Sequence, residues 1–385
     1  MKKNAPAYPL AAVSALAVAA GLVIATPAAA SADAQAHHQS PFATQQVNLV
    51  SNVPGKAALT DPDAANTWGL SLSPTSPLWV SNAGTGTSTL YTDAPDSSTV
   101  AKVAAVRVTI PGPGNSANGV PTGQVFNGGT GFVLSNGTTS GPAAFIFDTA
   151  TGEIAAWNPS VDPHQGAVEI KATEPGAAYT GLALATTSGG AQQLYAANFA
   201  QDRIDVFNST FGLVHGPSWA FKDAYIPKGY APFNAQTLNG DVYVTYAKVN
   251  KHNGMAVPGN GIGFVDEYTP EGSLVARIDS RVGLNDPWGL AIAPSSWGTL
   301  AGDLLIGNFG GGRITVVKQA QYGRHQSDRV VGQLTDGTTG KPIDIPGLWA
   351  LLPGTASTGG TDALWFSAGI NNQTDGLVGV LRHVS

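Results

Sequence analysis

The sequence contains no cysteine, which excludes disulfide bonds, thiolate metal sites and a cysteine nucleophile. A folded domain of this chain must therefore be held together by its core, and a chain of 385 residues is long enough to bury one. Charged residues are also scarce, at 11% of the chain, and only five of them are glutamate. The net charge is mildly negative, at −6, and the sequence has no basic cluster. Both observations argue against nucleic acid or an anionic membrane as a partner.

Long apolar runs are missing except near the start of the chain. Lys2 and Lys3 precede an apolar stretch over residues 10–25, which is followed by Pro27 and three alanines. This order predicts a secretory signal peptide and flexible leader in residues 1–36, because the apolar run is too short for a membrane span. We therefore expect no membrane insertion and a secreted, extracellular protein.

Glycine and proline, by contrast, are abundant, at 48 and 26 residues. Together with frequent Thr, Ser, Val and Asn they predict many short strands joined by tight turns. One block, DPWGLAIAP followed by GDLLIGNF, has an earlier copy, NTWGLSLSP followed by PLWVSN. Leu70 and Leu290 mark the same place in the two copies, which indicates an internal repeat.

The repeat unit is an apolar strand, a turn, a second strand and one or two further strands. Six such units follow one another, and the middles of their first strands are spaced by 56, 56, 53, 55 and 60 residues. This pattern predicts an all-β fold, a six-bladed β-propeller, as a single domain over residues 37–385. The first strands are centred on Leu70, Phe126, Leu182, Ala235, Leu290 and Ala350.

Individual units add detail to this prediction. The sixth unit has only three strands, and a spare strand at residues 45–50 precedes the first unit, so we expect the N-terminal strand to close the last blade. In the second unit we expect GFVLSNG to follow the first strand as the second, and in the fourth unit we expect an insertion at residues 249–261. Gly69 and Gly289 each follow a tryptophan, where neighbouring blades are expected to approach closely.

The blocks NTWGLSLSPTSPLWVSNAGTGTSTLY and DPWGLAIAPSSWGTLAGDLLIGNFGGGRITVV resemble those of a family of exported bacterial proteins, described mainly as uncharacterised. The repeats of that family are similar to NHL and related six-bladed propellers. The resemblance covers essentially the whole mature chain, and the WGLA block with its trailing N-F-G is its most specific part. It implies the propeller fold, but it brings no established activity and no agreed catalytic residues.

Residues before the first strand and after the second strand of each blade should meet at one mouth of a propeller's central channel. Amides offer donors and acceptors there, and aromatic rings offer stacking faces, so these residues are candidates for binding a ligand. Alternatively, each Asn caps a turn and each Trp packs between blades. The candidates are Asn66, Trp68, Asn82, Tyr179, Asn198, Asn285, Asp286, Trp288 and Asn308.

A metal site is a further hypothesis, because hard cations need several converging oxygen ligands. Asp61, Asp63 and Asp286, together with the channel asparagines, are the plausible group for Ca²⁺ or another divalent cation, and no other cofactor is indicated. In propeller lactonases, calcium is held by channel carboxylates and amides that include a glutamate. None of the five glutamates here lies at the start of a first strand, which weakens that analogy.

Two functions remain open. The first is an exported binding module, monomeric, whose channel mouth or fourth-blade insertion contacts a small polar ligand, a polysaccharide or an extracellular protein. The second is a metal-dependent hydrolase of the lactonase kind or a lyase, in which a cation polarises a carbonyl and a carboxylate moves a proton. The shortage of convergent acids favours binding, but whether the protein is an enzyme stays open because propellers host both functions.

Overall fold

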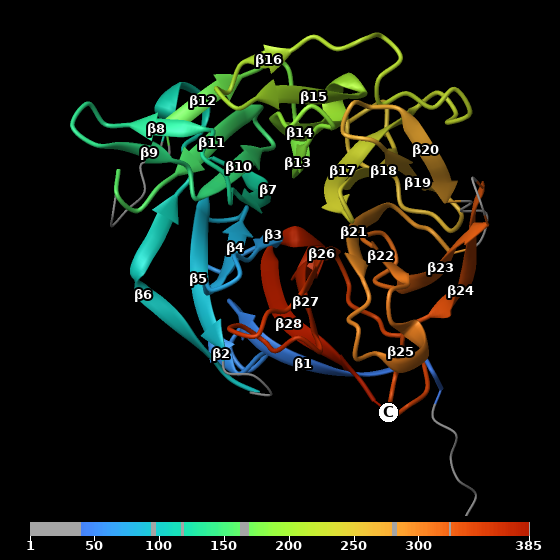
Figure 1. Ribbon diagram of the computed structural model, residues 1–385. Coiled ribbons are helices and arrows are strands. Elements are labelled where there is room, and N and C mark those ends of the chain that lie inside the picture. Colours follow the sequence, from blue (N-terminus) through green and yellow to red (C-terminus); the bar gives the residue numbers. More distant parts are fainter. Residues whose placement is uncertain are drawn as a thin grey trace, which may run out of the picture. The chain divides into compact units, whose positions relative to one another are not determined.

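The structure is a computed structural model that describes residues 40–93, 98–116, 119–161, 169–278, 283–322 and 325–384. The chain divides into two units, Met1–His38 and Gln39–Ser385, and the expected signal peptide and leader lie outside the described residues. In the second unit, six sheets surround a common centre as the blades of a propeller (Figure 1). The predicted fold class is thus confirmed. Among the described residues, no helix has the length and apolar character to cross a membrane.

Four of the blades consist of four consecutive antiparallel strands that run from the centre outward. Blade one contains β3 (Thr67–Ser71), β4 (Leu78–Asn82), β5 (Thr87–Asp93) and β6 (Val100–Thr109). Blade three contains β13 (Tyr179–Thr186), β14 (Gln192–Asn198), β15 (Arg203–Asn208) and β16 (Leu213–Val214). Blade four contains β17 (Tyr230–Leu238), β18 (Asp241–Lys248), β19 (Phe264–Tyr268) and β20 (Leu274–Ile278). Blade five contains β21 (Pro287–Ile292), β22 (Leu304–Asn308), β23 (Ile314–Tyr322) and β24 (His325–Gln333).

Blade two differs from the expected arrangement. Its strands are β7 (Pro121–Phe126), β10 (Phe145–Thr149), β11 (Glu153–Trp157) and β12 (Glu169–Thr173). The prediction that GFVLSNG supplies the second strand was wrong, because β8 (Val133–Ser135) pairs with β9 (Ser140–Pro142) in a separate hairpin. Phe132 and Leu134 are buried beside Phe211 of blade three, so the apolar pattern there reflects packing outside the blade's own sheet.

Blade six is completed by the N-terminal strand, as predicted. Its strands are β26 (Leu348–Pro353), β27 (Ala363–Gly369) and β28 (Asp375–His383), followed outward by β1 (Ala43–Ser51). The register of β1 on β28 runs from Thr44 opposite His383 to Ser51 opposite Leu377, and Figure 1 shows the blue strand beside the red one. Two short strands, β2 (Leu59–Thr60) and β25 (Thr335–Asp336), pair parallel to β1. This pairing closes the ring and covers an edge that β28 would otherwise expose.

The inner strands carry a β-bulge at the place where the blades approach most closely. In blade one the register shifts between Thr67 and Leu70, and in blade five between Pro287 and Leu290, so each Trp–Gly pair lies in the bulge. A Cβ on Gly69 would collide with the carbonyl oxygen of Thr122 in blade two, and a Cβ on Gly289 with that of Trp349 in blade six. The predicted reason for glycine at these two positions is therefore confirmed.

Candidate ligand-binding site at the channel mouth

Aromatic rings from four of the inner strands meet in the centre of the ring. Trp68 and Trp349 stack with their ring centroids 3.6 Å apart, and Trp288 meets both edge-on at 6.4 and 5.8 Å. The ring centroid of Phe233 lies 5.8 Å from that of Trp349. Each of these residues immediately precedes the small or polar residue of the bulge, so equivalent positions of different blades converge here. Thr122 and Thr180 occupy this position in blades two and three.

Two phenylalanines that follow the second strands extend this cluster. Phe309 stacks on Trp349 at 3.9 Å, and Phe199, the first residue of η2 (Phe199–Gln201), lies 5.2 Å from Phe233. Such ring pairs contribute about 0.5–1.5 kcal/mol each beyond the burial of their area. We call this cluster the aromatic plug; it consists of Trp68, Phe199, Phe233, Trp288, Phe309 and Trp349.

The aromatic plug separates two cavities. The smaller, of about 220 Å³, is the channel between the inner strands, and Trp288 contributes to its lining. The larger, of about 820 Å³, is lined by Trp68, Trp349 and Phe309 on the other side of the plug, and we call it the mouth cavity. Its size is that of sites that enclose a drug-sized molecule.

Two irregular segments supply much of the remaining wall of the mouth cavity. The first is the fourth-blade insertion, residues 249–261, which contributes Asn253, Met255 and Pro258. The second is α1 (Ile370–Gln373), in which three consecutive residues have left-handed backbones, with φ of 51° at Asn371, 55° at Asn372 and 66° at Gln373. Left-handed conformation costs a residue with a Cβ about 1–2 kcal/mol, so strain of this kind is concentrated at the rim of the cavity.

The described part of the mouth cavity's lining carries no charge. Of the described residues that line it, none has an ionisable side chain, and the polar ones are amides and a single threonine. An ionised ligand group would lose its hydration there without gaining a counter-charge, which is costly. The cavity is therefore suited to a neutral molecule.

Three of the aromatic and amide residues singled out from the sequence lie in or directly beneath this cavity. Asn66 and Trp68 line it. Trp288 lies in the aromatic plug below, where its Nε1–H donates to the Thr180 carbonyl oxygen at 2.7 Å. Tyr179 is fully buried, and its hydroxyl donates to Asp205 Oδ2 at 3.0 Å, so it does not reach the cavity.

Asn82, Asn198 and Asn308, at the ends of the second strands, instead form hydrogen bonds within their own blades. Asn82 Nδ2 donates to the hydroxyls of Thr87 and Thr89 at 3.2 and 2.9 Å. Asn198 Nδ2 donates to Asp205 at 2.7 Å, and Asn308 Nδ2 donates to the Arg313 carbonyl at 3.0 Å. All three are buried and none lines the mouth cavity, so their geometry matches the turn-capping alternative.

Neither Asn285 nor Asp286 lines the cavity; Asn285 anchors the insertion, and Asp286 binds the residue that follows the insertion. Asn285 Oδ1 accepts from the Gly259 N–H at 2.6 Å, and the Asp286 N–H donates to the Ile262 carbonyl at 3.0 Å. The carboxyl group of Asp286 is fully buried and finds no hydrogen-bond partner in the part of the chain that the structure describes. Burial raises the pKa of Asp286 to about 7.

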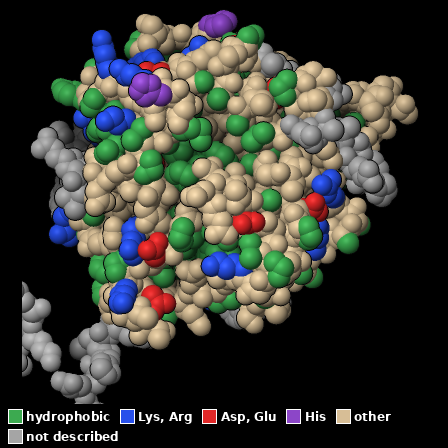
Figure 2. Space-filling model, turned by 180° about the vertical axis from the view of Figure 1, so that it is seen from behind, with side chains coloured by type: hydrophobic (Ala, Val, Ile, Leu, Met, Phe, Trp, Pro, Cys, Tyr) green, Lys and Arg blue, Asp and Glu red, His purple; other side chains and the backbone are tan. Residues whose placement is uncertain are grey.

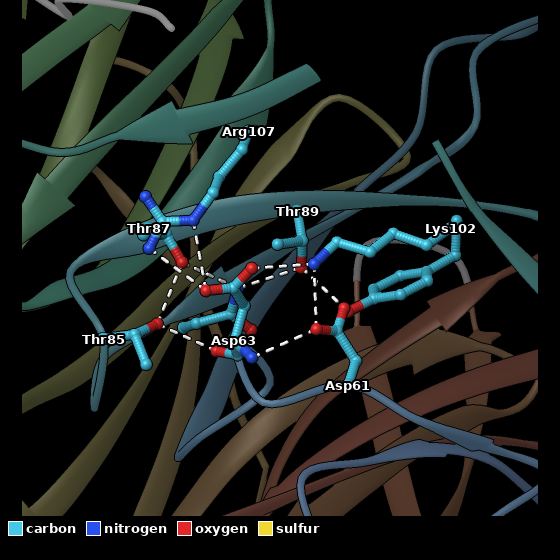
Figure 3. A network of polar contacts seen from close by, with 9 residues as sticks. Asp61, Asp63, Thr85, Thr87, Thr89, Lys102 and Arg107 are labelled. Atoms are coloured by element: carbon cyan, nitrogen blue, oxygen red, sulfur yellow. Dashed lines mark hydrogen bonds and ion pairs between the residues drawn. The ribbon is translucent and has the colours of Figure 1, made fainter. Parts of the chain in front are cut away.

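Asp61 and Asp63 belong to an ion-pair network in blade one (Figure 3). Lys102 Nζ lies between them, 2.8 Å from Asp61 Oδ1 and 2.7 Å from Asp63 Oδ2, and Arg107 Nε donates to Asp63 Oδ1 at 3.1 Å. Tyr91 donates its hydroxyl to Asp61 Oδ2 at 2.7 Å. Burial opposes ionisation of Asp63, but the hydrogen bonds from Arg107 and Lys102 outweigh it and lower the pKa of this carboxyl. The network fixes the segment before β3 onto β5 and β6.

The structure does not bring the three aspartates of the metal hypothesis together. Asp286 lies at the contact of blades four and five, bonded to Ile262 and Phe309, whereas Asp61 and Asp63 are neutralised in blade one. Within residues 40–384, apart from the gaps given above, no group of three or more His, Asp or Glu side chains is placed to hold a metal ion. A cation at Asp61 and Asp63 would have to displace Lys102. The sequence pattern alone did not show that Lys102 binds these two carboxylates.

Several residues of the cavity were not foreseen. Phe199 and Phe309 each follow the asparagine that ends a second strand, and Phe233 and Trp349 align with the tryptophans of the repeat, so a stricter alignment of the units could have found all four. Asn371, Asn372 and Gln373 have no counterpart in other blades and left no such signal.

On the face shown in Figure 2, charged side chains are few and scattered, and hydrophobic side chains gather near the centre.

No known family model matches the chain. Two viral proteins are similar over most of its length. The uncharacterized protein R648 of Acanthamoeba polyphaga mimivirus is 31% identical over 342 residues, which cover 87% of this chain and 80% of the viral protein. The uncharacterized protein L690 of the same virus is 32% identical over 345 residues, covering 88% and 86%. The resemblance noted above implied bacterial proteins, and these viral relatives do not support that part of it.

Solved structures resemble the chain in fold alone. The match to a streptogramin B lyase covers 88% of this chain and 97% of the lyase chain, at 11% identity and a TM-score of 0.44. An α-L-arabinanase of Penicillium chrysogenum complexed with arabinobiose covers 88% and 98%, at 11% identity and a TM-score of 0.48. These values carry no statement about activity.

Proposed function

This chain belongs to the same family as the uncharacterized mimivirus proteins R648 and L690, and from that premise we propose that it is a binding protein for a small, neutral, mainly apolar molecule. The observation that carries the proposal is the mouth cavity. It has a volume of about 820 Å³, a floor of aromatic rings and a described lining without charge. Burial of apolar ligand surface against that floor would supply most of the affinity.

The aromatic plug favours a compact apolar ligand over a polysaccharide. Both faces of the Trp349 ring are covered, one by Trp68 and the other by Phe309, so neither is free to stack on a sugar ring. The rings thus present a closed apolar floor instead of an open platform. A polymer would also have to follow a groove, whereas the lining residues enclose a single cavity.

The same lining favours binding over catalysis. General acid–base chemistry needs a titratable group within hydrogen-bond reach of the reacting atoms. The described residues that line the mouth cavity include no such group, and the carboxyl of Asp286 is buried away from solvent. A hydrolase or lyase mechanism therefore has no acid or base among the described residues of this cavity.

The proposal is tested with two fluorescent probes of similar size. N-phenyl-1-naphthylamine is neutral and 1-anilinonaphthalene-8-sulfonate is an anion, so we expect the neutral probe to bind saturably, at one site per chain, and the anion to bind at least about tenfold more weakly. Binding should also change the fluorescence of Trp68 and Trp349, which line the cavity.

A cavity-filling variant localises the binding. Ala200 lines the mouth cavity and is exposed, so Ala200→Trp should fill the opening and abolish binding of the neutral probe. Thr138→Trp, in the exposed turn between β8 and β9, is the matched control and should bind the probe normally. Equal binding by both variants, or no saturable binding by the original protein, would rule out the proposed site.

We also propose that the protein acts outside the cell, because residues 1–36 have the order of a secretory signal peptide. Protein recovered from the medium of an expressing culture should begin after Ala30, Ala34 or Ala36 when its N-terminus is sequenced. Recovery of the uncleaved chain from the cytoplasm alone would contradict this.

A further inference from the structure

The turn α1 brings three consecutive left-handed residues to the mouth cavity, and both local and distant hydrogen bonds hold it in this conformation. Asn371 Nδ2 donates to Asp375 Oδ2 at 2.9 Å, and the Thr374 hydroxyl donates to the Asn371 carbonyl at 2.7 Å. Asn52, in the segment after β1, donates from Nδ2 to Asp375 Oδ1 at 2.6 Å and accepts the Gly376 N–H at 2.8 Å. The segment that follows the ring-closing strand therefore also holds this turn in its unusual shape.

The turn presents two unused carboxamides to the cavity. Asn372 and Gln373 line it, and neither side chain forms a hydrogen bond to any described residue. A third amide lies beside them. A Cβ placed on Gly369 would touch both Asn66 Oδ1 and Gln373 Cγ, so Asn66 and Gln373 meet at this glycine. Asn66 Oδ1 already accepts from Trp349 Nε1 at 3.3 Å, which leaves its Nδ2 for a ligand.

These contacts make one corner of the mouth cavity polar while its floor is apolar. A carboxamide both donates and accepts hydrogen bonds, so the corner is complementary to a ligand group that does the same. A carboxylate would meet no cation among the described lining residues, and an ammonium would meet no anion. A wholly apolar ligand would cover the amides without replacing their hydrogen bonds to water.

Building on the proposed function, we propose that Asn372 and Gln373, with Asn66, determine specificity for a ligand that carries a carboxamide at one end of its apolar body. The aromatic plug contacts the body, and the corner amides exchange hydrogen bonds with the carboxamide. The hydrogen bonds of Asp375 to Asn52 and Asn371 hold the backbone of α1, so the two side chains start from fixed positions on the cavity wall. A backbone that is already held reduces the entropy lost on binding.

The test compares three probes that share one apolar body: naphthalene, 2-naphthamide and 2-naphthoate. We expect 2-naphthamide to bind the full chain about tenfold more tightly than naphthalene, and 2-naphthoate to bind least, as measured by tryptophan fluorescence. Gln373→Met keeps the length of the side chain but removes its hydrogen bonds, and Asn372→Gly keeps the left-handed backbone. Each should reduce the affinity for 2-naphthamide about three- to tenfold while the affinity for naphthalene changes less than twofold.

Gln236→Met is the matched control, because Gln236 lines the channel on the other side of the aromatic plug. It should leave the preference for 2-naphthamide intact, and thermal melting should show all three variants folded. If 2-naphthamide binds no better than naphthalene, or if folded Asn372→Gly and Gln373→Met keep the preference, this inference is overturned and the proposed function stands. If neither probe binds, both are overturned.

Discussion

The turns that precede β3 and β21 are two copies of one motif with different roles. Asn66 and Asp286 occupy the equivalent position, and both have φ of 47°. Their carbonyl groups accept from the residues that follow the second strands, Ala83 N–H at 3.1 Å and Phe309 N–H at 3.0 Å. The side chains diverge: Asn66 accepts from Trp349 and lines the mouth cavity, whereas Asp286 is buried without a described partner.

This difference shows what the repeat constrains and what it leaves free. The left-handed backbone restricts the position to residues that tolerate it, and blade six has Gly347 there, with φ of 70°. The neighbouring residue differs as well, since the methyl group of Ala65 cannot form the hydrogen bond by which Asn285 anchors the insertion at Gly259. The turn before β3 thus lines the mouth cavity, and the turn before β21 binds the insertion that forms part of the cavity wall.

The largest expected effect comes from the tryptophans that follow the two turns. Trp288→Ala should lower the free energy of unfolding by about 4 kcal/mol, because it opens a cavity in the aromatic plug and leaves the Thr180 carbonyl without its donor. Trp68→Ala should cost about 1 kcal/mol less, since the Trp68 Nε1–H has no described partner to lose. Urea unfolding of both variants measures the difference, and an equal or larger loss for Trp68→Ala would show that the two copies pack alike.

An intermediate effect should appear in the pH dependence of stability. Burial raises the pKa of Asp286 from 3.8 to about 7, so its contribution is complete below about pH 4 and is lost as the pH rises through 7. Burial likewise raises the pKa of Asp266 to about 7 and of Asp148 to about 6, so the melting temperature should fall between pH 4 and pH 8. Asp286→Asn, which copies blade one, should raise the melting temperature by about 3 °C at pH 8 and leave it unchanged at pH 4.

The reverse exchange is the control for that prediction. Asn66→Asp places an ionisable group at the blade-one turn, so it should lower the melting temperature at pH 8 more than at pH 4. Shifts of the same size at both pH values, for either variant, would show that ionisation at this position does not affect stability.

The smallest effect isolates the backbone that the two turns share. Ala and Gly both remove the side chain, but only Ala resists the left-handed conformation, so Asn66→Ala should be about 1 kcal/mol less stable than Asn66→Gly. The same difference is expected between Asp286→Ala and Asp286→Gly. Chemical denaturation at pH 5 measures both pairs, and a turn at which Ala equals Gly must have relaxed to another conformation.

Features that repeat were predictable from the sequence, because every blade must pack in the same way. The six units, the closing strand, and the glycines at Gly69 and Gly289 follow from that requirement. Asn66 and Trp68, which line the mouth cavity, could be singled out for the same reason, since they lie just before and within an aligned strand. Asn82, Asn198 and Asn308 flank strands too, but local hydrogen bonds use their side chains, which no spacing reveals.

Features that occur only once could not be predicted from the sequence. The metal hypothesis at Asp61 and Asp63 overlooked Lys102, which lies 41 and 39 residues further along the chain. The strained turn at Asn371 depends on the contact of Asp375 with Asn52, at a sequence separation of 323 residues. Such contacts between distant residues form only when the chain packs. A repeat in the sequence would have been needed to predict them, and these residues belong to none.

The closing strand also has a consequence for the time course of synthesis. Thr44 pairs with His383, so β1 is made among the first strands and must wait for almost the whole chain to leave the ribosome. At typical rates of about 5–20 residues per second, that delay is roughly 20–70 s. Until then the first blades exist as an open stack with exposed strand edges. Factors that shield such edges during translation should therefore affect the yield of this protein more than its final stability.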